Sequence, residues 1–103
     1  MTFCLKTTTI KPEHNIPINN AIILLHGYGG DGKDISTLTL NWKRFLPNTI
    51  FLCPNGHEQC PINPTGFQWF DLTKDDPQYI LDQSKKAEQK INQFISEIKN
   101  KYS

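Results

Sequence analysis

The stretch AIILLHGYGGDG, residues 21–32, joins a continuous apolar run to a glycine-rich turn. An apolar run of this length is typical of a strand buried on both faces of a parallel sheet. A helical stripe of apolar side chains follows over residues 34–46 and stops at Pro47, and a second strand-like run occupies residues 49–53. This alternation of strand, helix and strand predicts an α/β fold with at least part of a parallel sheet.

The rest of the sequence is expected to complete a single domain over residues 1–103. Residues 1–20 hold a first strand, predicted to run from residue 2 to residue 10, and a loop rich in Pro and Asn. Residues 21–72 contain the central unit and end in a long polar loop after residue 55. Residues 76–102 are predicted to form a helix, because Asp76 can cap it, Pro77 suits its first position and apolar side chains recur at helical spacing.

Composition favours a globular protein over several other classes. The chain has a net charge of +1, with 20% charged and 37% hydrophobic residues. This balance gives no electrostatic case for binding nucleic acid, and no apolar run approaches the length of a membrane span. No targeting segment is recognisable, so the three cysteines are expected to be free thiols and the location to be cytoplasmic.

The glycine-rich turn fits more than one pattern. Gly27, Gly32 and Lys33 have the spacing of a phosphate loop, but Asp34 stands where that loop needs Ser or Thr to hold a magnesium ion. Gly27, Gly29 and Gly32 also fit the dinucleotide fingerprint G-x-G-x-x-G, but the next strand does not end in the acid that would bind the ribose. Nucleotide binding is therefore kept as the weaker interpretation.

The third pattern is an oxyanion loop. A strand that ends in His-Gly before a glycine-rich turn resembles the loop after the third strand of α/β-hydrolases, where one backbone N–H binds the developing oxyanion. Further motifs follow in one order, namely Trp42, Leu46 with Pro47, FLCPN at residues 51–55 and QWFDL at residues 68–72. Together these motifs resemble the phospholipase/carboxylesterase family, which includes acyl-protein thioesterases. The resemblance implies a truncated α/β-hydrolase fold, made of the N-terminal strands and two helices of a mostly parallel sheet.

The resemblance assigns roles to few residues. The oxyanion donor would be the backbone N–H of the residue after His-Gly, which here is Tyr28, with Gly27 and Gly29 shaping the turn. Trp69 and Phe70 would lie beside the acyl site, although such aromatic side chains more often serve packing. The resemblance implies no cofactor.

The serine that would attack the substrate is not in this sequence. The family carries it in G-x-S-x-G on the turn after the next strand. Four serines are present, and none has glycines two residues away on both sides: Ser36, Ser84, Ser96 and Ser103. The triad Asp and His follow later still in the family order, so we expect the chain to have no appreciable esterase activity alone. His26 belongs to the turn and is expected to brace it by hydrogen bonds.

The absence of the nucleophile strand has a structural consequence. In the hydrolase sheet that strand flanks residues 21–25, so we expect an unpaired edge that favours association. The expected partner is a separately encoded C-terminal chain that completes the sheet, or a second copy bound through the same edge. A non-catalytic interaction module that keeps half of the fold is the alternative interpretation.

A few residues also have some metal-ligand character. Cys53, His57 and Cys60 lie close together in the sequence, and His14 is a fourth candidate. Their spacing is not that of a standard zinc site and prolines mark an ordinary loop, so no metal site is predicted. Cys60 as a nucleophile beside His57 is a further option, but a structural cysteine is favoured.

Overall fold

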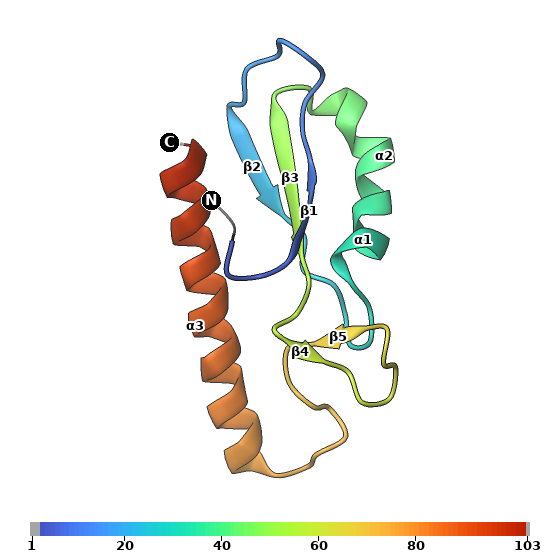
Figure 1. Ribbon diagram of the computed structural model, residues 1–103, viewed down its shortest axis with the longest axis vertical. Coiled ribbons are helices and arrows are strands. Elements are labelled where there is room, and N and C mark those ends of the chain that lie inside the picture. Colours follow the sequence, from blue (N-terminus) through green and yellow to red (C-terminus); the bar gives the residue numbers. More distant parts are fainter. Residues whose placement is uncertain (1–2, 103) are drawn as a thin grey trace.

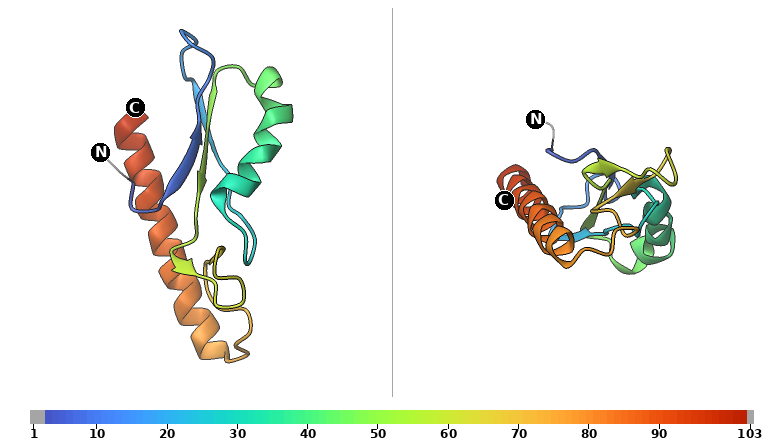
Figure 2. Two further views of the ribbon diagram at one scale, coloured as in Figure 1. Left: turned by 45° about the vertical axis from the view of Figure 1, so that its right-hand side comes forward. Right: turned by 90° about the horizontal axis from the view of Figure 1, so that it is seen from below.

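A small sheet with helical segments on both faces forms the centre of the computed structural model, which describes residues 3–102. In chain order its elements are β1 (Thr7–Ile10), β2 (Asn20–Ile23), α1 (Gly32–Ile35), η1 (Ser36–Leu38), α2 (Thr39–Trp42), η2 (Lys43–Phe45), β3 (Thr49–Pro54), β4 (Glu58–Gln59), β5 (Phe67–Gln68) and α3 (Pro77–Tyr102). Figure 1 shows α3 on one side of the sheet and the segment from α1 to η2 on the other. The turn after β2 and the β4–β5 hairpin lie together beyond one end of the sheet (Figures 1 and 2).

Strand β3 is the centre of the sheet and is buried along its whole length. Successive side chains of a strand point to opposite faces, and β3 divides its apolar residues accordingly. Ile50 and Leu52 pack with Phe94 of α3 in one core cluster. Phe51 and Cys53 form the second cluster, on the opposite face. The predicted buried strand over residues 49–53 is therefore confirmed.

The strand order is β1-β3-β2, so β2 and β1 are the two edges. Strand β2 pairs with β3 in parallel, as the sequence predicts, with Ile22 opposite Phe51. The expected burial of this strand on both faces is wrong, because β2 is an edge strand whose residues are exposed or half-buried. Strand β1 pairs with β3 in the antiparallel direction, with Thr8 opposite Cys53. Strand β1 is also shorter than predicted, because it begins at Thr7; residue 2 lies outside the described residues.

The helix predicted over residues 34–46 is more broken than expected. It begins at Gly32, is capped by Asp31, and alternates between α-helical and 3₁₀ turns up to Phe45. The hydroxyls of Ser36, Thr37 and Thr39 donate to carbonyls three residues earlier, at 2.6, 2.8 and 2.7 Å. Such bonds compete with the regular helical ladder, and we attribute the interruption to them.

The long loop predicted over residues 55–72 contains a hairpin that the sequence did not indicate. Its two-residue strands β4 and β5 pair in the antiparallel direction, with Glu58 opposite Gln68. Below the sheet in Figure 1, this hairpin lies beside the turn that follows β2.

Helix α3 begins where the sequence predicts. The Asp76 carboxylate accepts a hydrogen bond from the Gln78 amide at 3.0 Å, and Pro77 is the first helical residue. Its second half packs on the sheet through Phe94 and Ile98, whereas its first half extends past the sheet (Figure 1). Across residues 3–102, no helix combines the length and the apolar character that a membrane crossing requires.

Candidate active site

His26 holds the turn after β2 in place. Its side chain is buried and its Nε2 accepts a hydrogen bond from the Gly56 amide at 2.8 Å. Because Nε2 is an acceptor, the ring proton is on Nδ1, which lies 2.6 Å from the Gly27 carbonyl oxygen. The ring stacks on Trp69, whose indole N–H donates to the His26 carbonyl at 3.1 Å. The predicted bracing role of His26 is confirmed.

The turn is also attached to strand β5 through its backbone. The Gly29 amide donates to the Phe67 carbonyl at 3.0 Å, and the Phe67 amide donates to the Gly30 carbonyl at 2.8 Å. Gly29 has a φ of +80°, a conformation that glycine adopts without strain. A side chain at Gly66 would overlap the Gly29 carbonyl, so the turn and the β5 hairpin fit closely against each other.

Tyr28 differs from the two glycines that follow it in what its backbone N–H contacts. The Gly29 and Gly30 amides are occupied by carbonyl oxygens, whereas within the described residues no acceptor is found for the Tyr28 amide. The Tyr28 hydroxyl lies 3.4 Å from an oxygen of Asp71. Burial, followed by contacts with Cys60 and Asp71, raises the pKa of Tyr28 to about 12, so its phenol stays protonated at neutral pH. Within the described residues the Gly27 and Asp31 amides likewise have no acceptor, so the Tyr28 amide is one of the open N–H donors of the turn.

Two of the amides that a phosphate would need are already bonded. The Gly32 amide donates to Asn55 Oδ1 at 2.8 Å, and the Asp34 amide donates to Asp31 Oδ1 at 2.7 Å. A hollow of about 320 Å³ opens beside the turn, and the residues that line it include Gly27 and the two acids Asp31 and Asp34. Carboxylates in this position would repel phosphate, which argues against both nucleotide-binding interpretations.

These features agree with what the comparisons with known proteins find. The model of the phospholipase/carboxylesterase family matches residues 7–103. The chain belongs to this family. It is also similar to the crystal structure of esterase PE8, with a TM-score of 0.81 and 28% sequence identity over 95% of this chain and 46% of that chain. The fold is therefore the N-terminal portion of an α/β-hydrolase, and the chain spans about half of the esterase's length.

In this member of the phospholipase/carboxylesterase family, the described serines all lie in helical segments. Ser36 is in η1, and Ser84 and Ser96 are in α3; Ser103 lies outside the described residues. The Ser84 hydroxyl donates to the Ile80 carbonyl of its own helix at 2.6 Å. The three described serines thus occupy helical positions, away from a strand-to-helix turn.

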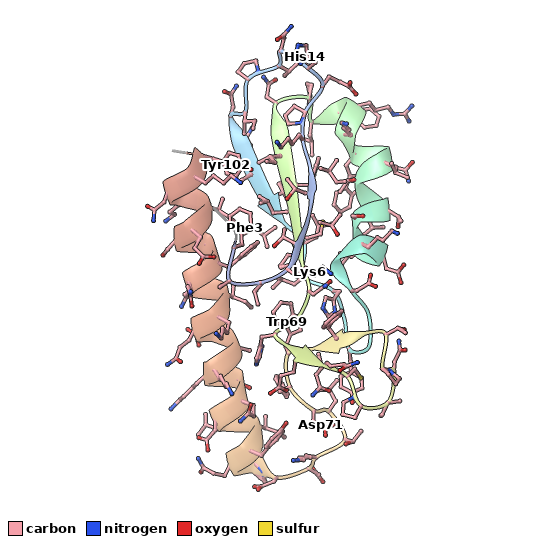
Figure 3. The ribbon with its side chains drawn as sticks, viewed as in Figure 1. Phe3, Lys6, His14, Trp69, Asp71 and Tyr102 are labelled. Atoms are coloured by element: carbon pink, nitrogen blue, oxygen red, sulfur yellow. The ribbon has the colours of Figure 1, made fainter. Side chains whose placement is uncertain are left out.

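The two aromatic residues predicted to line an acyl pocket differ in their surroundings. Trp69 packs against the core cluster around Phe94 and stacks on His26, so it has a structural role. Figure 3 shows Trp69 near the centre of the molecule, between the sheet and the β4–β5 hairpin. Phe70 is half-buried. Contact of either residue with an acyl chain stays a prediction.

The structure does not assemble the cysteine and histidine candidates into one centre. Among residues 3–102, no group of three metal-ligating side chains comes together. Cys53 and Cys60 are buried, and all three cysteines are free, as predicted. Burial opposes ionisation of Cys60, but hydrogen bonds from the Asn63 and Ile62 amides outweigh it and lower the pKa of the thiol. Among the described residues neither ring nitrogen of His57 has a hydrogen-bond partner, so Cys60 and His57 do not form a hydrogen-bonded pair. Burial lowers the pKa of His57, and the charges that act on it are those of Glu58 and two lysines of α3.

Two glycine substitutions should distinguish backbone strain from steric overlap as the reason why this turn needs glycine. Gly29→Ala is expected to destabilise the chain by about 1–2 kcal/mol, because alanine is strained at positive φ. Gly27→Ala should change stability by less than about 1 kcal/mol, because a methyl group there meets nothing within 4 Å. Urea unfolding of both variants measures the difference. Equal losses at the two positions would contradict the conformation assigned to Gly29.

Proposed function

We propose that this chain supplies the oxyanion-binding part of a serine hydrolase that cleaves carboxylic esters or thioesters through an acyl-serine. The Tyr28 amide would donate to the substrate carbonyl oxygen as it becomes negative, and the serine nucleophile would come from a segment other than residues 1–103. The observation that carries the proposal is the open amide of Tyr28, which directly precedes two amides that β5 and the turn itself have engaged. A donor fixed in advance stabilises a transition state without reorganisation.

The rigidity of the turn supports this proposal. Its position depends on the His26 ring, on the backbone bonds to Phe67 and on the Asn63 side chain, which donates to the Gly29 carbonyl at 2.8 Å. An oxyanion donor must lie within a few tenths of an ångström of its productive position, and these contacts come from three separate segments. A turn that served only as a connection would not need them.

The partner that we propose is a C-terminal strand-and-helix unit that carries the nucleophile and adds to the free edge of β2. The Asn20 amide donates to Asn48, just before β3, and the Leu24 amide donates to Leu52 of β3. By alternation, the Ala21 and Ile23 amides face the open edge. A mostly apolar cavity of about 430 Å³ lies next to this edge, between β2 and the end of α3. An unpaired edge beside an apolar surface favours strand addition.

Complementation tests the function. We expect the 103-residue chain alone to leave a short-chain p-nitrophenyl ester unhydrolysed. Mixed or co-expressed with the segment of a family esterase that lies outside the matched region, it should hydrolyse the ester, and a serine-directed phosphonate should block the reaction. Phosphonate-sensitive hydrolysis by the chain alone would refute the proposal.

An edge variant tests the partner. Ala21→Pro removes an outward-facing N–H without breaking the bonds to β3, and should abolish complementation, whereas Ala21→Val should preserve it. A stable complex that forms without hydrolysis would favour the alternative function, a non-catalytic interaction module. Pairing of two copies through β2 would appear as a dimer that Ala21→Pro dissociates, and would identify self-association instead.

A further inference from the structure

The peptide unit that would bind the oxyanion is held in place by its carbonyl oxygen. The Tyr28 N–H belongs to the same planar unit as the Gly27 carbonyl, and in a trans peptide the two groups point in opposite directions. The Gly27 oxygen accepts hydrogen bonds from the Gly30 amide at 3.1 Å and from His26 Nδ1 at 2.6 Å. Because the unit is rigid, the contacts of its oxygen also fix the direction of its N–H.

The His26 imidazole can make this bond in only one of its two neutral forms. Nδ1 must carry the proton, and Nε2 must be free to accept the Gly56 N–H, whose nitrogen lies 2.8 Å away. In the other tautomer, two N–H groups would face each other at Nε2 and two lone pairs would face each other at Nδ1. His26 is 5% exposed and its ring stacks on Trp69, so the ring cannot turn out to solvent without losing this packing. The Gly56 amide therefore selects the tautomer that donates to Gly27.

These groups form a chain of hydrogen bonds that runs in one direction. The Gly56 N–H donates to the ring, the ring donates to the Gly27 carbonyl, and the Tyr28 N–H lies on the far side of that peptide unit. Each bond draws electron density from the next donor along the chain, so the bonds strengthen one another by roughly 10–30% each. The Tyr28 amide at the end of the chain is therefore a stronger donor than an isolated amide.

We propose that His26 is a positioning residue of the oxyanion site, which orients and polarises the Gly27–Tyr28 peptide unit through its Nδ1–H. This role rests on the proposed function, since it concerns the donor that the oxyanion would use. It goes beyond holding the turn, because it assigns a separate task to each ring nitrogen. Nε2 fixes the tautomer by accepting from Gly56, and Nδ1 acts on the peptide unit. Loss of the second task should lower the rate of the chemical step even where the turn keeps its fold.

Two substitutions of His26 separate the tasks of the two ring nitrogens. The side-chain amide of His26→Asn can donate to the Gly27 carbonyl from about the position of Nδ1. The longer side chain of His26→Gln reaches the position of Nε2 and can accept the Gly56 N–H. Both variants lose the stacking on Trp69, so they are matched in packing. In the complemented hydrolase, we expect kcat of His26→Gln to be about tenfold below that of His26→Asn, with similar KM values.

Nuclear magnetic resonance of the 103-residue chain tests the same role without catalysis. The ring ¹⁵N shifts of His26 should show the proton on Nδ1. The Tyr28 amide proton should move upfield in His26→Gln by more than it does in His26→Asn, because only the Gln variant loses the donor to the Gly27 carbonyl. Failure of the proposed function would abolish hydrolysis in the parent and in both variants and leave these spectra as expected, so the two proposals can fail separately.

Three results would overturn the role assigned to His26. The first is a ring proton on Nε2 in the parent chain, a result that does not depend on whether either variant folds. The second is an equal kcat for His26→Asn and His26→Gln, which would mean that the ring contributes packing alone. The third is a shift of the Tyr28 amide proton that is the same in both variants, which would mean that the bond from Nδ1 does not polarise the peptide unit.

Discussion

Replacing Phe94 with Ala is expected to lower the free energy of unfolding by about 3–5 kcal/mol, a large part of the total stability of a small domain. Phe94 is fully buried and packs against Ile50 and Leu52 of β3 and, edge to face, against Phe3 at a ring-centroid distance of 5.2 Å. It is the main link between α3 and the sheet. Truncating it removes apolar contacts from both and leaves a cavity that neighbouring side chains cannot fill.

Urea unfolding, followed by circular dichroism, measures this loss. Phe45→Ala is the matched control, because Phe45 is 71% exposed and contacts Arg44 at the surface. The control should change stability by less than about 1 kcal/mol. A similar loss for both variants would mean that Phe94 does not join α3 to the sheet.

Local signals in the sequence predicted the elements that local bonds determine. Asp76 and Pro77 fix the start of α3, because a cap and a proline act on the next few residues only. The apolar run at residues 49–53 predicted a buried strand, because a strand with neighbours on both edges and layers on both faces has no side for polar residues. These inferences needed no knowledge of what the elements contact.

Features that depend on distant contacts were missed. The antiparallel direction of β1 depends on its pairing with β3, more than 35 residues later in the chain, and no local signal encodes it. The hairpin of β4 and β5 is held partly by the turn, through the bonds of Phe67 to Gly29 and Gly30. The break in the helix after Gly32 was readable in principle, since Ser36, Thr37 and Thr39 compete for backbone carbonyls, but the apolar stripe dominated the prediction.

The candidate site likewise has features that the local sequence predicted and features that depend on distant contacts and were missed. The His-Gly turn could be recognised because its glycines and its place after a strand are visible in the sequence, and the bracing role of His26 followed from them. His57 was considered only as a metal ligand or as a partner of Cys60, since its sequence neighbours are Cys53 and Cys60. The lysines that act on it belong to α3, about 30 residues further along the chain, so no sequence spacing could have connected them.

The open amide of Tyr28 can be tested apart from the Tyr28 side chain. In the complemented hydrolase, Tyr28→Pro removes the backbone N–H and is expected to lower kcat by about 10²–10³-fold, the cost of one oxyanion donor. KM should change little, because the lost hydrogen bond strengthens only as the oxyanion forms. Proline requires a negative φ. Tyr28 meets this requirement, because Asn15 is the residue for which a positive φ is found among the described non-glycine residues.

Tyr28→Phe is the control that makes this result interpretable. It keeps the amide and removes the hydroxyl, whose bond to Asp71 is long at 3.4 Å, so kcat should stay within a few-fold of the parent. If both variants lower kcat equally, the side chain and not the amide is responsible. If Tyr28→Pro instead raises KM at constant kcat, the turn binds substrate without stabilising the transition state. Because Tyr28→Pro can also shift the turn, its effect on catalysis counts only if the variant binds the complementing segment as tightly as the parent does.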